Sequence, residues 1–162
     1  MTQFATYSDL LAAITDDAGR DILNPATGEV VGHAPEGTVE DLNAAVETAR
    51  TAQKDFAKLS DAERCELLTK AAAAVDANAE ALVELLSREQ GKPLNGPNAR
   101  FEVGACSGWL NATAAFEHPN YTAVDDDITA TVDYRPLGVV GAIGPWNWPM
   151  ICLLYTSDAA DE

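Results

Sequence analysis

The segment from Leu137 to Pro149 constrains the fold of this chain more than any other part of the sequence. It opens with small and β-branched residues, a composition typical of a strand that is buried inside a parallel sheet. Pro145 ends this run, and Asn147 follows between two tryptophans and a second proline. Because prolines restrict the backbone and tryptophans exclude water, the loop is predicted to aim the Asn147 amide in a fixed direction. The end of a strand is also where open α/β sheets bind ligands.

A second interpretation of this segment stays open from its residues alone. The two prolines, Pro145 and Pro149, also suit a stiff turn that carries two core tryptophans and a surface asparagine. Three upstream blocks make the pattern more specific: residues 24–30 (NPATGEV), 59–64 (LSDAER) and 89–94 (EQGKPL). Together with residues 138–149 they resemble the aldehyde dehydrogenase superfamily, in the order in which that family places them.

The resemblance covers roughly residues 20 to 151, and members of that family are several-fold longer. It therefore implies an α/β chain that forms the N-terminal part of the aldehyde dehydrogenase fold. The expected contents are helices, an incomplete Rossmann-like sheet and a strand of an oligomerisation hairpin. The last residues, 152–162, depart from the family pattern and look like a translated adaptor joined to a truncated reading frame. A short natural helix cap is the alternative for this tail.

The same resemblance predicts four parts along the chain. Residues 1–120 are expected to be the mostly helical start of the nucleotide-binding domain, and residues 121–136 an oligomerisation or bridging strand. Residues 137–151 are expected to hold the first core strand and the loop with Asn147, and residues 152–162 the tail outside the family.

Apolar periodicity and capping residues predict helices near residues 38–56, 60–75, 80–88 and 98–116. Thr38 with Asp41, and Ser60 with Glu63, form capping-box pairs at the first two starts. A turn at residues 24–28 predicts a hairpin that ends near Ala34. The predicted apolar stripes are Leu42, Ala45, Val46, Ala49, Ala52 and Phe56, then Leu67, Leu68, Ala71, Ala72 and Val75, then Leu82, Leu85 and Leu86, and last Phe101, Ala105, Trp109, Ala112 and Phe116.

The resemblance implies that the protein oxidises an aldehyde to a carboxylic acid, with hydride passing to NAD or NADP. Asn147 matches the family's amide donor to the developing oxyanion. Ile143, Gly144, Pro145 and Trp146, with Asn147 itself, match positions that lie against the cofactor. The family's cysteine nucleophile and its general base belong to segments outside this sequence. We therefore expect the 162-residue chain alone to be inactive.

The sequence predicts no cluster of metal ligands. In some relatives, however, the position matching Glu89 helps hold a monovalent cation with backbone oxygens near Ile22 and Leu23. A solvated carboxylate near a helix end is the alternative for Glu89. Lys92 is expected to complement the dipole at the end of the same helix.

The net charge of −16 argues against binding to nucleic acids or anionic membranes, which requires clustered lysine and arginine. No apolar run reaches the roughly 18 residues of a membrane span. Three widely spaced cysteines, Cys65, Cys106 and Cys152, fit a reducing cytoplasm. The expected partners are an aldehyde substrate and further copies of the chain. The alternative function is a non-catalytic α/β interaction module that pairs through an edge strand at Ile128–Tyr134.

Overall fold

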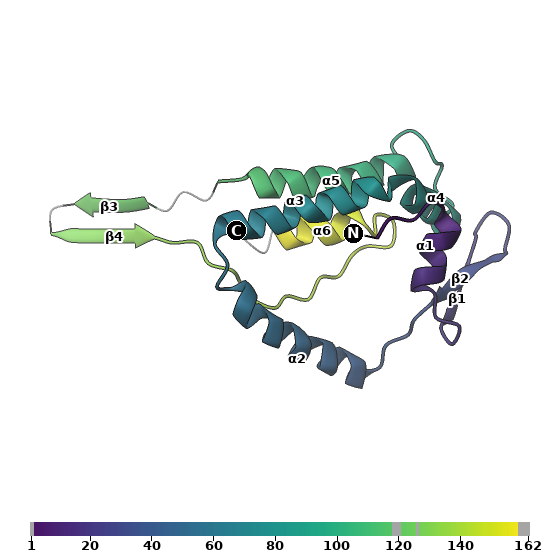
Figure 1. Cartoon of the computed structure of the whole chain (residues 1–162), viewed down its shortest axis with the longest axis horizontal. Coiled ribbons are helices and arrows are strands. Elements are labelled where there is room, and N and C mark those ends of the chain that lie inside the picture. Colours follow the sequence, from purple (N-terminus) through teal and green to yellow (C-terminus); the bar gives the residue numbers. More distant parts are fainter. Residues whose placement is uncertain (1, 118–120, 126, 159–162) are drawn as a thin grey trace.

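A computed structural model describes residues 2–117, 121–125 and 127–158, and most of them are helical (Figure 1). The elements in chain order are α1 (Tyr7–Ile14), β1 (Arg20–Leu23), β2 (Val30–Ala34), α2 (Val39–Phe56), α3 (Asp61–Ala77), α4 (Ala79–Gln90), α5 (Ala99–Ala115), β3 (Tyr121–Asp125), β4 (Ile128–Val132) and α6 (Ile151–Asp158). The predicted mixture of helices and strands is confirmed. In the described part of the chain, the strands form two separate antiparallel pairs, β1–β2 and β3–β4.

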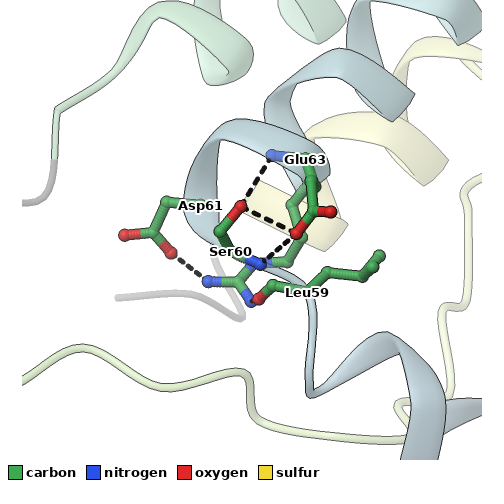
Figure 2. Close-up of polar contacts among 5 residues, drawn as sticks. Leu59, Ser60, Asp61 and Glu63 are labelled. Carbon is green, nitrogen blue, oxygen red and sulfur yellow. Dashed lines mark hydrogen bonds and ion pairs between the residues drawn. The ribbon is translucent and has the colours of Figure 1, made fainter.

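Local side-chain contacts explain where the first helices begin. At the start of α3, the Ser60 hydroxyl accepts a hydrogen bond from the Glu63 N–H, and the Glu63 carboxylate accepts one from the Ser60 N–H at 2.8 Å (Figure 2). Thr38 and Asp41 form the same reciprocal pair at the start of α2. Both predicted capping boxes are confirmed. A further box at Thr6 starts α1.

The predicted hairpin is also confirmed. Arg20 of β1 faces Ala34 of β2, and Gly28 in the turn has a φ of 76°, which glycine adopts without strain. Gly91 ends α4 in the left-handed conformation, with a φ of 70°. A Cβ at Gly91 would come within 2.7 Å of Pro25 Cγ, so the end of α4 lies directly against the turn of the hairpin.

The core forms where α4 meets its neighbours. One cluster consists of Val83, Leu86, Ala99 and Val103 from α4 and α5, and Val75 of α3 packs against it. A second cluster joins Leu10 of α1 to Ala81 and Leu85 of α4. The prediction that α4 buries Leu85 and Leu86 is confirmed.

The inward face predicted for α5 is wrong. Phe101, Trp109 and Phe116 are 54%, 41% and 64% exposed, and Ala112 is exposed as well. The buried residues of this helix are Ala99, Glu102, Val103, Cys106 and Ser107. Small side chains on this face let α5 lie close to α3 and α4, whereas bulky aromatic side chains would hold the helices apart.

The apolar stripes of α2 and α3 are buried less than their patterns predict. No residue of α2 is buried, and Figure 1 shows this helix standing away from the other helices. In α3 only Ala72 is buried, and Leu67 is 45% exposed. α3 nevertheless packs against α5, with Ala72 buried and Val75 on the core cluster, whereas no described element buries the stripe of α2.

The predicted edge strand appears as β4, which pairs with β3 in a hairpin that projects from the helices (Figure 1). Tyr121 pairs with Val132 and Asp125 with Ile128. Nothing in the local sequence pattern predicted β3. Ile128 is 71% exposed and Val124 is 70% exposed, so the apolar residues of this hairpin are open to solvent.

The buried strand predicted at residues 139–143 is wrong for this structure. These residues lie between β4 and α6 without forming a strand, and Val140 and Ile143 are 50% and 91% exposed. A central strand needs hydrogen-bonded neighbours on both sides, and the described residues supply none. Its apolar composition therefore remains unburied here. Every helix in the described ranges is too short or too polar to traverse a lipid bilayer.

Candidate functional site

The loop from Gly144 to Met150 connects the extended segment to α6, and it carries Asn147 near its centre. Just before Asn147, the Trp146 carbonyl accepts a hydrogen bond from the Gln90 side-chain amide at 2.8 Å. Gln90 is the last residue of α4 and belongs to the block 89–94. The tertiary structure thus joins two of the blocks on which the family resemblance rests.

Just after Asn147, the loop is held by Glu102 of α5. One carboxylate oxygen, Oε1, accepts hydrogen bonds from the backbone N–H groups of Met150 at 2.9 Å and Ile151 at 3.4 Å. The other oxygen, Oε2, pairs with the ammonium group of Lys92. The Glu102 side chain is 0% exposed and that of Lys92 is 17% exposed, so this is a buried ion pair. A carboxylate at the N-terminus of α6 also interacts favourably with the helix dipole.

Trp148 packs into the same arrangement. Its ring meets Phe101 edge to face, with centroids 5.8 Å apart and planes at 84°. The Lys92 ammonium lies 4.7 Å from the centroid of the Trp148 ring, within the range of a cation–π interaction. Phe101 is therefore part of the site and not of the helix core. The loop is anchored before Asn147 by Gln90 and after it by contacts with Trp148, Met150 and Ile151.

The residues predicted to contact the cofactor, 143–147, are all exposed. Ile143 and Trp146 are 91% and 86% exposed, and Asn147 is exposed as well. The expectation that both tryptophans exclude water is wrong for Trp146, whereas Trp148 is half-buried. Gly144 lies close to α6, where an added Cβ would be 3.3 Å from Leu153 Cγ. The catalytic and cofactor-binding roles of these residues stay predictions.

The acidic residue predicted as a possible cation ligand, Glu89, lies in the last turn of α4 and is half-buried. Burial raises its pKa, the nearby Glu102 carboxylate raises it further, and Lys92 opposes both effects. Glu89 is therefore less solvated than an exposed carboxylate, and the choice between a solvated side chain and a cation ligand stays a prediction. Ile22 and Leu23 lie in β1, whose turn contacts Gly91, but the cation site itself stays a prediction. Among the described residues, no group of three histidine, cysteine, aspartate or glutamate side chains is placed to hold a metal ion.

Cys106 lies one helical turn after Glu102 in α5, and it is fully buried. Burial and the negative charge of Glu102 raise the pKa of its thiol to about 11. The thiol is therefore protonated at neutral pH and does not act as a nucleophile. The prediction that Cys106 is a buried small residue is confirmed.

A separate cavity of about 420 Å³ lies between α1 and α4 and is lined in part by Tyr7, Arg88 and Arg100. Arg88 pairs with Glu84 at 2.7 Å and Arg100 pairs with Glu80. Because both arginines are already paired with glutamates, the cavity has less positive charge available to bind an anionic ligand than its two arginines suggest. None of the predicted site residues lines it.

Sequence reasoning missed Gln90 and Glu102 as anchors of the loop, and it gave Lys92 only a role at the helix end. Glu102 left a signal in the sequence, since it lies three residues after Ala99 and four before Cys106. A carboxylate on a stripe of small apolar residues is expected to have a buried partner. The contact of Gln90 left no such signal, because it joins residues 56 positions apart.

Comparison with known proteins decides the family. The profile of the Aldehyde dehydrogenase family matches residues 14–160. The chain belongs to this family. The match includes residues 152–160, which the sequence analysis set apart from the family, and α6 begins at Ile151.

Individual aldehyde dehydrogenases agree with this assignment. Over 142 residues the chain is 32% identical to succinate-semialdehyde dehydrogenase [NADP(+)] 2 of Schizosaccharomyces pombe, covering 85% of the chain and 28% of that protein. It is 34% identical over 151 residues to a non-phosphorylating aspartate-semialdehyde dehydrogenase of Halomonas elongata, covering 89% and 30%. The chain thus spans less than a third of the length of these relatives.

Solved structures of aldehyde dehydrogenases share the fold. A glyceraldehyde-3-phosphate dehydrogenase of Methanocaldococcus jannaschii, in complex with NADP, matches with a TM-score of 0.79 and 28% identity over 86% of this chain and 31% of its own. An NAD-dependent aldehyde dehydrogenase of Sinorhizobium meliloti matches with a TM-score of 0.72 and 38% identity, covering 82% and 27%. The predicted family fold is therefore confirmed for the part that this chain spans.

Proposed function

We propose that this chain is the N-terminal part of an enzyme that oxidises an aldehyde to a carboxylic acid. NAD or NADP, when bound, accepts the hydride from the substrate. The observation that carries this proposal is the contact between the blocks 89–94 and 144–150, which anchors the loop on both sides of Asn147. Relatives named for succinate and aspartate semialdehydes support an aldehyde as the substrate class.

In this proposal, Asn147 donates a hydrogen bond from its side-chain amide to the substrate oxygen as negative charge develops there. A donor that is already oriented favours the transition state over the ground state, because no reorganisation is needed during the reaction. The anchored loop supports that role. Because Asn147 is exposed in this structure, other groups would have to cover its side-chain amide in the complete enzyme.

The cofactor is proposed to lie against residues 143–147. The large apolar side chains of Ile143 and Trp146 are almost fully exposed, and contiguous exposed apolar surface is typical of a binding site. Gly144 places no side chain between the backbone and a ligand. These features fit a dinucleotide that lies along the loop backbone. A relative solved with NADP and another named as NAD-dependent support the cofactor class.

The 162-residue chain alone is proposed to be inactive, because the reaction needs a thiolate nucleophile and a general base. Cys106 is excluded as that nucleophile by its burial and its raised pKa. The isolated chain is therefore expected to oxidise no aldehyde, as followed by the absorbance of reduced cofactor. Steady turnover by the isolated chain would contradict this part of the proposal.

The experiment that tests the role of Asn147 is its replacement by alanine in the complete enzyme. We expect kcat to fall by a factor on the order of 10²–10³, the usual effect of losing one oxyanion donor. The dissociation constant of the cofactor, measured by fluorescence titration, is expected to change far less. Asn111→Ala, at an exposed position of α5, is the matched control and should leave kcat unchanged. An unchanged kcat in Asn147→Ala contradicts the assigned role.

Assembly through the β3–β4 hairpin is a further part of the proposal. An isolated two-stranded hairpin is marginally stable by itself, and this one exposes Tyr121, Val124 and Ile128. Pairing with the sheet of a second copy would cover these side chains and saturate the strand edge. The exposed edge equally suits the alternative function, a non-catalytic module that binds another protein. Light scattering of the complete protein, with Ile128→Lys as the variant, separates homo-oligomers from other assemblies.

The proposed division of the chain follows from its membership of the aldehyde dehydrogenase family. In this proposal, residues 1–120 form the helical start of the nucleotide-binding domain, residues 121–136 the bridging hairpin, and residues 137–151 the core strand and loop. Strand formation at residues 139–143 is proposed for the complete enzyme, where neighbouring strands are present. A reducing, cytoplasmic location is proposed from the three widely spaced cysteines, whose spacing matches neither a disulfide framework nor a metal-ligand cluster.

A further inference from the structure

Glu102 is the largest side chain in the described residues that is completely buried, and it is a carboxylate. Placing a charge in the interior is unfavourable unless a counter-ion and hydrogen bonds compensate for lost water. Here three groups compensate: the Lys92 ammonium and the backbone N–H groups of Met150 and Ile151. All buried side-chain polar atoms in the described residues have a hydrogen-bond partner.

The three partners of Glu102 come from two segments that are distant in sequence. Lys92 follows α4, whereas Met150 and Ile151 form the junction between the loop and α6. Glu102 lies 10 residues after Lys92 and 48 residues before Met150. A single side chain therefore ties the end of α4 to the start of α6, and α5 supplies a rigid support between them.

The two carboxylate oxygens of Glu102 have different hydrogen-bond partners. Oε2 is directed to Lys92, which in turn lies over the Trp148 ring, and Oε1 is directed to the backbone of the loop. Glu102 thus contacts the backbone N–H groups where the loop joins α6, in addition to the Lys92 side chain. It fixes where α6 begins and hence the position of the loop residues that precede it.

We infer that Glu102 is a positioning residue which, with Lys92, sets the orientation of the loop that carries Asn147. It does so from one side, while Gln90 holds the Trp146 carbonyl on the other side. Asn147 lies between these two anchors: it directly follows Trp146, and only Trp148 and Pro149 separate it from Met150. The effect on catalysis rests on the function proposed for Asn147, but the effect on the loop does not.

The first test measures the loop directly, by NMR hydrogen exchange of the Met150 and Ile151 amides in the 162-residue chain. Glu102→Ala is expected to speed their exchange at least about tenfold, because both amides lose a charge-assisted hydrogen bond. The internal reference is the Gly91 amide, which bonds to the Ser87 carbonyl at 2.8 Å and should change little. Glu80→Ala, which breaks an exposed pair with Arg100, is the matched control.

Equal acceleration at Met150, Ile151 and Gly91 would indicate general loosening and would overturn the inference, as would no change at any of them. Should Glu102→Ala not fold, Glu102→Gln decides, since it keeps the shape and one carbonyl acceptor. A neutral acceptor is about half as strong as a charged one, so acceleration of about threefold confined to these two amides supports the inference. Exchange in Glu102→Gln that matches the unsubstituted chain overturns it.

The second test uses the complete enzyme and separates orientation from binding. Glu102→Ala is expected to lower kcat by about tenfold or more while KM for the aldehyde changes less, and Glu102→Gln should recover most of the loss. If Asn147→Ala lowers kcat but Glu102→Ala does not, the inference fails and the proposed function stands. If Asn147→Ala leaves kcat unchanged, the proposed function fails, and the exchange measurement still decides whether Glu102 holds the loop.

Discussion

Helices α2 and α4 have similar sequence patterns but very different surroundings. Both are amphipathic and both have acidic residues in the first turn. Nevertheless α4 buries Ala81, Val83, Leu85 and Leu86, whereas α2 buries no residue. An amphipathic pattern therefore identifies the face that a helix can bury. Whether the face is buried depends on the elements that surround it.

The largest expected effect comes from the ion pair beside α4, compared with a pair at the end of α2. Lys92→Met leaves the buried carboxylate of Glu102 without its counter-ion, which should cost about 3–5 kcal/mol of unfolding free energy. Lys58 pairs with Asp55 at 2.7 Å, but both side chains are exposed. Lys58→Met should therefore cost no more than about 1 kcal/mol. Urea unfolding of both variants measures this difference, and equal costs would show that burial of the pair does not matter.

The next effect compares matched leucines of the two helices. Leu86 of α4 is 2% exposed and Leu42 of α2 is 64% exposed. Leu86→Ala is expected to lower the free energy of unfolding by about 2–5 kcal/mol, because it leaves a cavity in the core. Leu42→Ala should stay within about 0.5 kcal/mol, as is usual for surface positions. A comparable loss for Leu42→Ala in chemical denaturation would reveal that α2 has a packing partner in solution.

A smaller effect concerns the helix caps, for which burial should make no difference. Hydrogen bonds from the Ser60 N–H and hydroxyl hold the pKa of Glu63 below its ordinary 4.5, and Thr38 lowers that of Asp41 from 3.8 in the same way. Because the folded state lowers these pKa values, each carboxylate stabilises the fold above its unfolded pKa. This contribution is lost as the pH falls through the folded pKa.

Glu63→Gln on α3 and Asp41→Asn on α2 should therefore both lower the thermal midpoint at neutral pH. The differences from the unsubstituted chain should shrink below about pH 4, when the carboxylates of that chain become protonated. Circular dichroism melting curves across this pH range give the measurement. A pH-independent difference for either variant would show that its carboxylate charge does not contribute.

The smallest expected effect has the opposite sign and arises at the end of α4. Burial and the Glu102 charge raise the pKa of Glu89 above its ordinary 4.5. The folded state therefore favours the protonated form, so its contribution is fully present below the unfolded pKa and is lost as the pH rises through the folded pKa. Glu89→Gln should raise the thermal midpoint at pH 7, with the gain vanishing below about pH 4. A lower midpoint at pH 7 would indicate that the Glu89 charge has a favourable partner, such as a bound cation.

The sequence predicted the local features of the fold well. The capping boxes at Thr38 and Ser60, the hairpin before Ala34 and the glycine that ends α4 all follow from interactions within a few residues. The stripe predicted for α5 is wrong because its aromatic residues do not face the core. Small residues occupy that face instead, since they allow closer helix packing. The segment at 139–143 was misassigned because a strand requires neighbours that its own residues do not encode.

By itself, the sequence determined the family, the helix boundaries and the loop that carries Asn147, because motifs and helix caps depend on residues that are close together in the chain. Only the tertiary structure decided which faces are buried and which residues hold the loop. Gln90, Lys92 and Glu102 meet that loop across dozens of positions in the chain. Such contacts depend on how the helices pack, since desolvation of a charge such as Glu102 is tolerated only where the fold brings its partners together.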